Sequence, residues 1–415
     1  MKKQSNTPKI RFHNYKELWE CDDLKNIFGT IRNAFVGTAT PYYVEKGHFY
    51  LESNNVKNGK INYNSQIFIN DEFYEKQRDK WLKTNDIVMV QSGHVGHTAV
   101  IPEELDNTAA HALIVFTDYN KEVNPHFLNY QFQSNSKRKE LDLISTGNTI
   151  KHILASEMKN FKMDFPTVDE QSAIGFLFRT LDDLLVSYKD NFANYQSLKS
   201  TMLSKMFPKA GQTVPEIRLG GFEGKWEVQT LKELASFSKG NGYTKNDLVN
   251  SGKEIILYGR LYTNYQTVIS QVNTFVTKVK ANAVISKGGE VIVPASGESA
   301  EDISRASVVE KSGVILGGDL NIIYPDESKV DSIFLALTIS NGSQQKELIK
   351  RAQGKSVVHL RNNDLEKVLL HYPSMEEQQA IGSYFSNLDN LINSHQEKIS
   401  QLETLKKKLL QDMFI

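Results

Sequence analysis

Two long segments of the chain carry hydrophobic residues at steps of three and four positions. This spacing draws one apolar stripe along a helix and is typical of a helix that packs lengthwise against another helix. Each segment follows a proline, Pro166 or Pro373, and acidic residues that suit a helix N-terminus. The predicted stripes comprise Ile174, Phe178, Leu181, Leu185, Tyr188, Phe192, Tyr195, Leu198 and Met202 in the first helix, and Ile381, Phe385, Leu388, Ile392, His395, Ile399, Leu402, Leu405 and Leu409 in the second.

The two helical segments belong to a repeat that covers the chain at an offset of 207 positions. Trp19 recurs as Trp226, and Phe207 recurs as Phe414. A repeat of this length is a whole module rather than a solenoid unit. If the two copies are related by a pseudo-two-fold axis, the helices are antiparallel and form a rod roughly 50 Å long.

The rest of each copy is rich in short apolar runs that end in turn residues. Such runs at 86–96, 111–116, 288–299 and 313–325 predict strands. Helical patterns at 125–141 and 330–351 make the predicted fold class α+β, that is, mixed α/β.

The repeat predicts four parts: a globular domain at 1–165, a helix at 166–207, a second domain at 208–372 and a second helix at 373–415. The linker at 208–215 is rich in proline, glycine and small polar residues, as expected of a junction. Residues 30–130 and 237–330, in contrast, share little beyond strand positions. A duplicated frame with diverged middles is the pattern expected of one scaffold that presents two different recognition surfaces.

Composition narrows the protein class. Lys and Arg total 49, as do Asp and Glu, so the formal net charge is zero. A DNA-binding domain that acts alone is usually basic, so the balance favours local basic surfaces or partners that share the contacts. Cys21 is the only cysteine, which excludes an intrachain disulfide and Cys-rich zinc sites. No apolar run approaches the length of a membrane span, and we expect a cytoplasmic protein with a buried or idle thiol.

No catalytic motif emerges from the sequence. The GKS at 354–356 fails as a phosphate loop, because the required upstream glycine is Ile349. Dinucleotide, zinc-protease and nucleophile-elbow motifs are absent, and the histidines show no metal-ligand spacing. The sequence therefore predicts no catalytic residues, no metal site and no cofactor bound by this chain.

The chain does carry residues suited to a nucleic-acid surface, because Lys and Arg neutralise phosphates and polar loop residues contact base edges. The candidates in the first domain are Lys57, Lys60, Ser92, His94, His97, Lys137, Arg138 and Lys139. Those in the second domain are Lys239, Tyr243, Arg260, Tyr262, Arg305, Lys350, Arg351, Lys355 and Arg361.

Three duplicated motifs, taken together and in order, carry a family resemblance. They are the P-x-I-R segment with its tryptophan (Pro8 to Trp19, Pro215 to Trp226), P-x-x-x-E-Q-x-x-I (Pro166 to Ile174, Pro373 to Ile381) and G-x-(S/T) (Gly147 to Thr149, Gly354 to Ser356). Each E-Q stretch is followed by a Leu-Asp pair and a long helix. Over essentially its whole length, the chain resembles a Type I restriction-modification specificity subunit.

The resemblance implies two target recognition domains, each bound to one half of a split, asymmetric site in double-stranded DNA. It implies that a coiled coil sets the gap and docks two methyltransferase subunits, which carry S-adenosylmethionine and methylate adenine N6. Two motor-nuclease (restriction) subunits that use ATP and Mg would join for cleavage. This chain would be non-catalytic.

Two other functions remain open from the residues alone. A stand-alone DNA-binding regulator with two reading heads would bind DNA tightly without partners. A duplicated protein–protein adaptor would show no sequence-selective DNA binding even with methyltransferase present.

Overall fold

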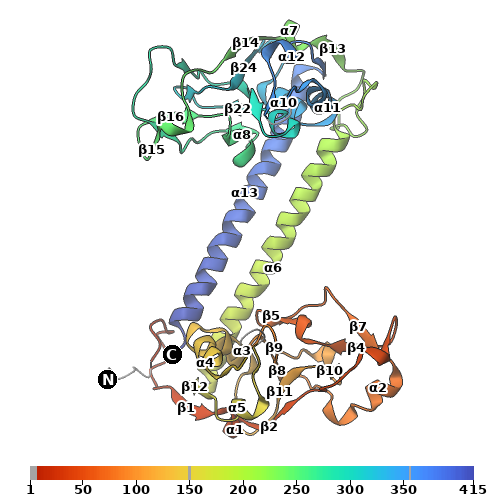
Figure 1. Cartoon of the computed structure of the whole chain (residues 1–415), viewed down its shortest axis with the longest axis vertical. Coiled ribbons are helices and arrows are strands. Elements are labelled where there is room, and N and C mark those ends of the chain that lie inside the picture. Colours follow the sequence, from red (N-terminus) through yellow and green to blue (C-terminus); the bar gives the residue numbers. More distant parts are fainter. Residues whose placement is uncertain (1–6, 148–150, 355–356) are drawn as a thin grey trace. The chain divides into compact units, whose positions relative to one another are not determined.

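The computed structural model describes residues 7–147, 151–354 and 357–415. Its contacts divide the chain into two compact units, which are described separately (Figure 1). Unit 1 comprises Met1–Lys189 and Glu397–Ile415, and unit 2 comprises Asp190–Gln396. Each unit therefore combines segments from both copies of the repeat.

Unit 1 is built on two four-stranded sheets. The first is antiparallel, in the order β2 (Phe28–Asn33), β11 (Leu113–Tyr119), β8 (Ile87–Val90) and β9 (Thr98–Val100). The second has the order β10 (Ala109–Ala110), β4 (His48–Leu51), β7 (Ile67–Ile69) and β3 (Tyr43–Val44). Every residue of β8 is buried, as expected of a strand covered on both faces.

Short elements complete unit 1. Strand β1 (Glu20–Asp23) pairs with β12 (Lys162–Phe165), and β5 (Val56–Lys57) forms a hairpin with β6 (Lys60–Ile61). The helices are α1 (Leu24–Ile27), α2 (Asp71–Glu75), α3 (Pro125–Gln133), α4 (Asn135–Ile144) and α5 (Ala155–Met158).

Unit 2 is built on two five-stranded sheets. The first has the order β14 (Ala235–Lys239), β24 (Leu320–Pro325), β20 (Glu290–Pro294), β22 (Ser307–Val309) and β17 (Val268–Ile269). The second has the order β15 (Leu248–Val249), β18 (Phe275–Val276), β16 (Lys253–Ile256), β23 (Ile315–Leu316) and β19 (Val284–Ile285).

Two strand pairs and six helices surround these sheets. The pairs are β13 (Glu227–Thr230) with β26 (Leu369–Tyr372) and β21 (Ser296–Gly297) with β25 (Val358–His359). The helices are α7 (Leu231–Leu234), α8 (Arg260–Thr263), α9 (Ala300–Ile303), α10 (Ser332–Ser340), α11 (Gly342–Arg351) and α12 (Asn362–Leu365).

The frame elements of the two units correspond at the 207-residue offset found in the sequence. Helices α3, α4 and α5 recur as α10, α11 and α12, and the Glu20↔Phe165 register recurs as Glu227↔Tyr372. The strand predictions at 86–96, 111–116, 288–299 and 313–325 are confirmed, since each stretch contains or enters a strand.

The helical predictions at 125–141 and 330–351 need one correction. Each is two helices rather than one, because Ser134 and Asn341 leave the helical conformation with ψ of 153° and 165°. Ser134 caps the second helix by accepting a hydrogen bond from the backbone of Lys137 at 3.3 Å.

The two long helices are α6 (Val168–Lys205) and α13 (Met375–Asp412), each of 38 residues. Within unit 1, α6 residues Asp182 and Lys189 contact α13 residues Lys406 and Glu403, so these segments run in opposite directions. Within unit 2, Lys199 and Tyr195 contact Asp389 and His395 in the same antiparallel sense.

The predicted stripe needs a correction near the end of each helix. Leu198 and Leu405 are 37% and 43% exposed, whereas the side chains of their neighbours Lys199 and Lys406 are only 20% and 15% exposed. Strict alternation of four and three places the lysines, not the leucines, on the inner face. The other predicted stripe residues are buried or half-buried.

Across residues 7–147, 151–354 and 357–415, no helix combines the length and the apolar character needed to cross a bilayer.

Candidate nucleic-acid interface

A bidentate ion pair ties the start of each copy to its long helix. In unit 1, Arg11 donates from Nε and Nη2 to Glu170 at 2.8 and 2.7 Å, and the Glu170 side chain is fully buried. In unit 2, Arg218 binds Glu377 in the same way at 2.7 and 2.6 Å. Hydrogen bonding to the carboxylate raises the pKa of both arginines. This contact explains why the P-x-I-R and E-Q motifs recur together.

The glutamine of each E-Q motif anchors the loop before the next helix. Gln171 accepts from the Asn124 backbone at 3.0 Å and donates to the Pro166 carbonyl at 2.9 Å. Gln378 makes the matching bonds to the Asp331 backbone and the Pro373 carbonyl. Both glutamines are buried, so their amides are fully committed to the frame.

The hydrophobic core of each unit contains an aromatic cluster to which the other copy of the repeat contributes one phenylalanine. Phe414, at the end of α13, packs on Trp19, Phe127 and Phe178 in unit 1. In unit 2, Phe207, at the end of α6, packs on Trp226, Phe334 and Phe385. Each core is therefore completed by the far end of the opposite repeat.

A groove of about 590 Å³ lies in unit 1 between the β5–β6 hairpin, α4 and the paired segments of α6 and α13. Of the predicted DNA-binding residues, Lys57, Lys60 and Arg138 line it. The helices add Lys189, Lys406 and Lys407, which sequence reasoning missed. The lysine at 406 could have been found by extending the strict four–three alternation.

The predicted histidines stand beside this groove. His97 Nδ1 accepts a hydrogen bond from the Asn58 backbone at 3.2 Å, and its ring lies 6.2 Å from that of His94. Burial lowers the pKa of His97, and Arg138, His94 and Lys57 lower it further by repulsion. His97 thus holds the hairpin by accepting this hydrogen bond. Ser92 forms an isolated β-bridge with His152. Residues 148–150 of the G-x-(S/T) segment lie outside the described residues.

The predicted cluster Lys137, Arg138 and Lys139 is divided by the structure. Lys137 is buried and its ammonium lies 2.9 Å from Asp164, so this residue is corrected from a surface contact to a core ion pair. Arg138 and Lys139 are exposed. Consecutive helical residues point about 100° apart, so only one of the three faces the core.

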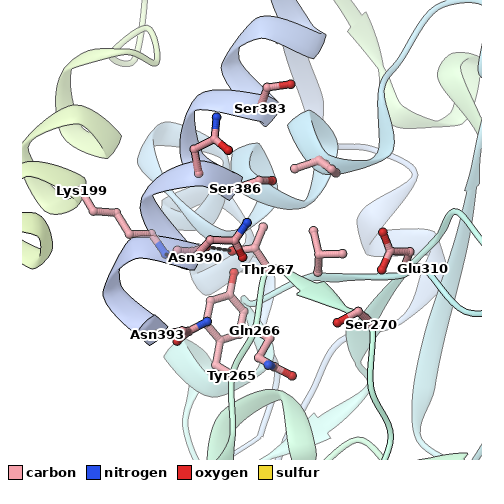
Figure 2. Close-up of a pocket in the computed structure, with 14 residues that line it drawn as sticks. Lys199, Tyr265, Gln266, Thr267, Ser270, Glu310, Ser383, Ser386, Asn390 and Asn393 are labelled. Atoms are coloured by element: carbon pink, nitrogen blue, oxygen red, sulfur yellow. Dashed lines mark hydrogen bonds and ion pairs between the residues drawn. The ribbon is translucent and has the colours of Figure 1, made fainter. Parts of the chain in front are cut away.

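A groove of unit 2 beside α13 is polar, and Lys199 is the cation among the residues that line it. It has a volume of about 650 Å³ and is lined chiefly by hydroxyl and amide side chains from α13 and the segment before β17 (Figure 2). Its lysine, Lys199, contacts Asp389, which also accepts from Thr267 Oγ1 at 3.2 Å. Ser383, Asn390 and Asn393 present the amides and hydroxyls.

Two predicted residues of unit 2 meet in a further cavity of about 640 Å³, lined by Tyr243, Tyr258 and Arg260. Tyr243 is only 5% exposed and its hydroxyl donates to the Lys278 carbonyl at 3.2 Å, so it is corrected from a free contact to a core residue. Arg260 is bound to Gln266 at 2.8 Å and to the Gln271 carbonyl at 2.9 Å, which ties down a loop. Burial lowers the pKa of Arg260.

The other predicted residues of unit 2 are scattered. Tyr262 is half-buried beside Tyr258, Arg305 lies over the Tyr265 ring at 5.7 Å, and Arg351 pairs with Glu347 at 2.7 Å. Exposed side chains without an ion pair to any described residue belong to Lys239, Lys350 and Arg361. Lys355 lies outside the described residues.

The described residues offer no metal site. Among them, no group of three His, Cys, Asp or Glu side chains is placed to hold a metal ion. Cys21 is exposed on β1, and its pKa is raised by partial burial and by Asp164, which lowers the fraction of reactive thiolate.

Comparison with known proteins identifies relatives along most of the chain. The family described as Type I restriction modification DNA specificity domain matches residues 39–191 and 223–404. The MjaVIII specificity subunit of Methanocaldococcus jannaschii is 21% identical over 79% of this chain and 77% of its own length. The putative MjaX specificity subunit of the same organism is 22% identical over 98% of this chain and 95% of its own length.

A solved structure shows the same fold. The crystal structure of the Type I restriction-modification S subunit from M. genitalium aligns with a TM-score of 0.63 over 99% of both chains, at 15% identity. The family matches in two successive segments that together span most of the sequence. The chain therefore belongs to the Type I restriction-modification specificity subunits, which are non-catalytic DNA-recognition components.

Proposed function

We propose that each half of this chain recognises one half of a bipartite, asymmetric DNA site. The observation that carries the proposal is a duplicated frame bearing unlike surfaces. The Arg–Glu pairs, the anchoring glutamines and the aromatic clusters recur at one offset, while the grooves beside them differ in charge. A frame kept constant under divergent surfaces suits two heads that contact different base pairs.

In this proposal, α6 and α13 form one antiparallel coiled coil that sets the unread gap between half-sites. Support comes from the antiparallel contacts within each unit and from the equal length of the two helices. The coiled coil also offers the docking surface for two methyltransferase subunits, which would bring S-adenosylmethionine to adenine N6. Two motor-nuclease subunits that use ATP and Mg would add cleavage.

The proposed domain limits follow the same frame: recognition domains at 1–165 and 208–372, and spacer helices at 166–207 and 373–415. Each recognition domain would carry its own half-site contacts, and each spacer helix would close the opposite domain through Phe207 or Phe414.

The test is to express the chain with its partner methyltransferase in a host without other adenine methylation and to map modified adenines across the genome. We expect one split, asymmetric motif. An unsplit motif, or no motif with an active methyltransferase present, would contradict the proposal. A control strain with the methyltransferase alone should show no motif.

A further inference from the structure

The unit 1 groove begins at a hairpin that fixes two lysines. Lys57 pairs with Lys60 across a two-residue turn, Asn58–Gly59, in which both residues have positive φ, 52° and 84°. Positive φ at both positions defines the tight hairpin turn that Asn-Gly favours. The buried side chain of Asn129 fixes the turn, because its amide donates a hydrogen bond to the Gly59 carbonyl at 2.9 Å. Both lysines are therefore presented by a rigid support.

The groove carries positive charge that the protein does not neutralise. Its two carboxylates are occupied, since Asp182 pairs with Lys406 and Glu403 pairs with Lys189 at 2.6 Å. The remaining cations, Lys57, Lys60, Arg138 and Lys407, have no carboxylate within 4.0 Å among the described residues. They come from three elements, β5–β6, α4 and α13, around one concave surface.

The repeat shows that the frame does not need these charges. At the offset of 207, Arg138 corresponds to Gln345, Lys407 to Ser200, Lys189 to Gln396 and Glu403 to Gln196. Lys199 and Asp389 keep the inner pair, so the packing is retained while the outer charges are lost. The unit 2 cavity at this offset, of about 260 Å³, is lined by Lys199, Thr267 and Gln345. Its further cation is Arg305, which has no ion pair to a carboxylate among the described residues. The charge of unit 1 therefore serves a ligand rather than the fold.

We propose that the groove formed by Lys57, Lys60, Arg138 and Lys407 binds the sugar-phosphate backbone of duplex DNA, and that unit 2, whose counterpart cavity carries Arg305 in their place, forms a weaker electrostatic clamp. This inference rests on the proposed function. Long, flexible lysines suit phosphate contacts rather than base reading, since ammonium groups act as point charges. The clamp contributes affinity that is independent of sequence and sensitive to salt, and it anchors the first half-site more strongly than the second.

The test uses the full chain with its methyltransferase and compares Arg138→Gln/Lys407→Ser, which installs the unit 2 residues, with a matched control. The control, Lys225→Gln/Lys232→Gln, removes two exposed cations of unit 2 away from either groove. Affinity for duplexes with and without the target site is measured over a range of salt concentrations. Each lost phosphate contact should reduce the salt slope by about 0.9, so the wild type should lose roughly tenfold more affinity than the variant between about 50 and about 200 mM salt.

We expect the variant to lose the same amount of affinity for both duplexes and to methylate the same motif as the wild type. The control variant should keep the wild-type affinity and salt slope. A wild-type salt slope in the variant would overturn the clamp, as would a loss confined to the target duplex. Weakened methyltransferase binding with a normal DNA slope would instead assign the groove to an acidic protein surface and would also overturn it. Failure of the proposed function is distinguishable, because the wild type would then show no motif, whereas the slope on random duplex still reports on the groove.

Discussion

Lys406 of α13 contacts Asp182 of α6 inside unit 1, with side chains that are 15% and 7% exposed. Asp182 also accepts from the Tyr130 hydroxyl at 2.8 Å. The same pair recurs in unit 2 between Lys199 and Asp389, where the side chains are 20% and 25% exposed. A charged pair on an otherwise apolar face fixes the register of two helices, since any slip leaves a buried charge without a partner.

Asp182→Asn should therefore destabilise unit 1 by about 3 kcal/mol, because the buried Lys406 ammonium loses its counter-charge. The more exposed Asp389→Asn should cost less, about 1 kcal/mol. Urea unfolding, with hydrogen exchange to locate the loss, measures both. Equal losses would show that burial does not set the strength of the pair. Asp182→Asn/Lys406→Met should recover most of the stability.

Arg11→Lys and Arg218→Lys should each lower the free energy of unfolding by about 1–2 kcal/mol, because lysine cannot make the bidentate contact with a buried carboxylate. The two effects should be similar, since the contact is duplicated. Thermal unfolding of the single variants is the measurement. An unchanged midpoint in either variant would show that the ion pair does not stabilise that frame, and Lys16→Gln, an exposed neighbour of Arg11, serves as control.

Stability should fall in acid through His126. Burial, together with a smaller repulsion from Arg179, lowers the pKa of His126 to about 4. Because the folded-state pKa lies below the ordinary value of 6.5, the unfolded chain binds the proton first as pH falls, so stability is full above about pH 6.5 and is lost from there toward pH 4. Partial solvent screening limits the loss to on the order of 1–2 kcal/mol.

The measurement is the unfolding midpoint of unit 1 between about pH 7 and about pH 4. His126→Asn should flatten this dependence, while His13→Asn, at an exposed position, should leave it intact. A steep acid loss that persists in His126→Asn would assign the effect to other groups.

Phe414→Ala should lower the free energy of unfolding of unit 1 by about 3 kcal/mol, although the residue belongs to the second repeat. The ring is 6% exposed and packs on Trp19, Phe127 and Phe178. Hydrogen exchange should rise in β1 and β12 and stay constant in β13 and β26. Phe207→Ala should give the reverse pattern, and uniform exchange changes in both units would contradict the composite cores.

Four residues inserted in step into both α6 and α13, about 6 Å of helix, should lengthen the unread gap by one or two base pairs if the helices act as a spacer. The methylation map measures the gap directly. An insertion in one helix alone serves as control and should abolish methylation, because the pairing falls out of register. An unchanged gap in the double insertion would rule out the spacer.

Residue periodicity determined much of this fold without the structure. The 207-residue repeat, the two long helices and the main strands follow from local patterns of apolar residues, which depend only on neighbours in the chain. The E-Q and P-x-I-R motifs were visible as repeats. Their mutual contact was not, because Arg11 and Glu170 are far apart in sequence.

Tertiary structure decided which similar residues have which role. Lys137 is buried and Arg138 exposed, although both are basic neighbours, because the direction of a helix relative to the core is set by packing. Lys406, rather than Leu405, lies on the inner face because it forms an ion pair with Asp182 of the facing helix. The basic groove likewise gathers Lys57, Arg138 and Lys407 from three distant segments, and only the folded chain brings these charges onto one surface.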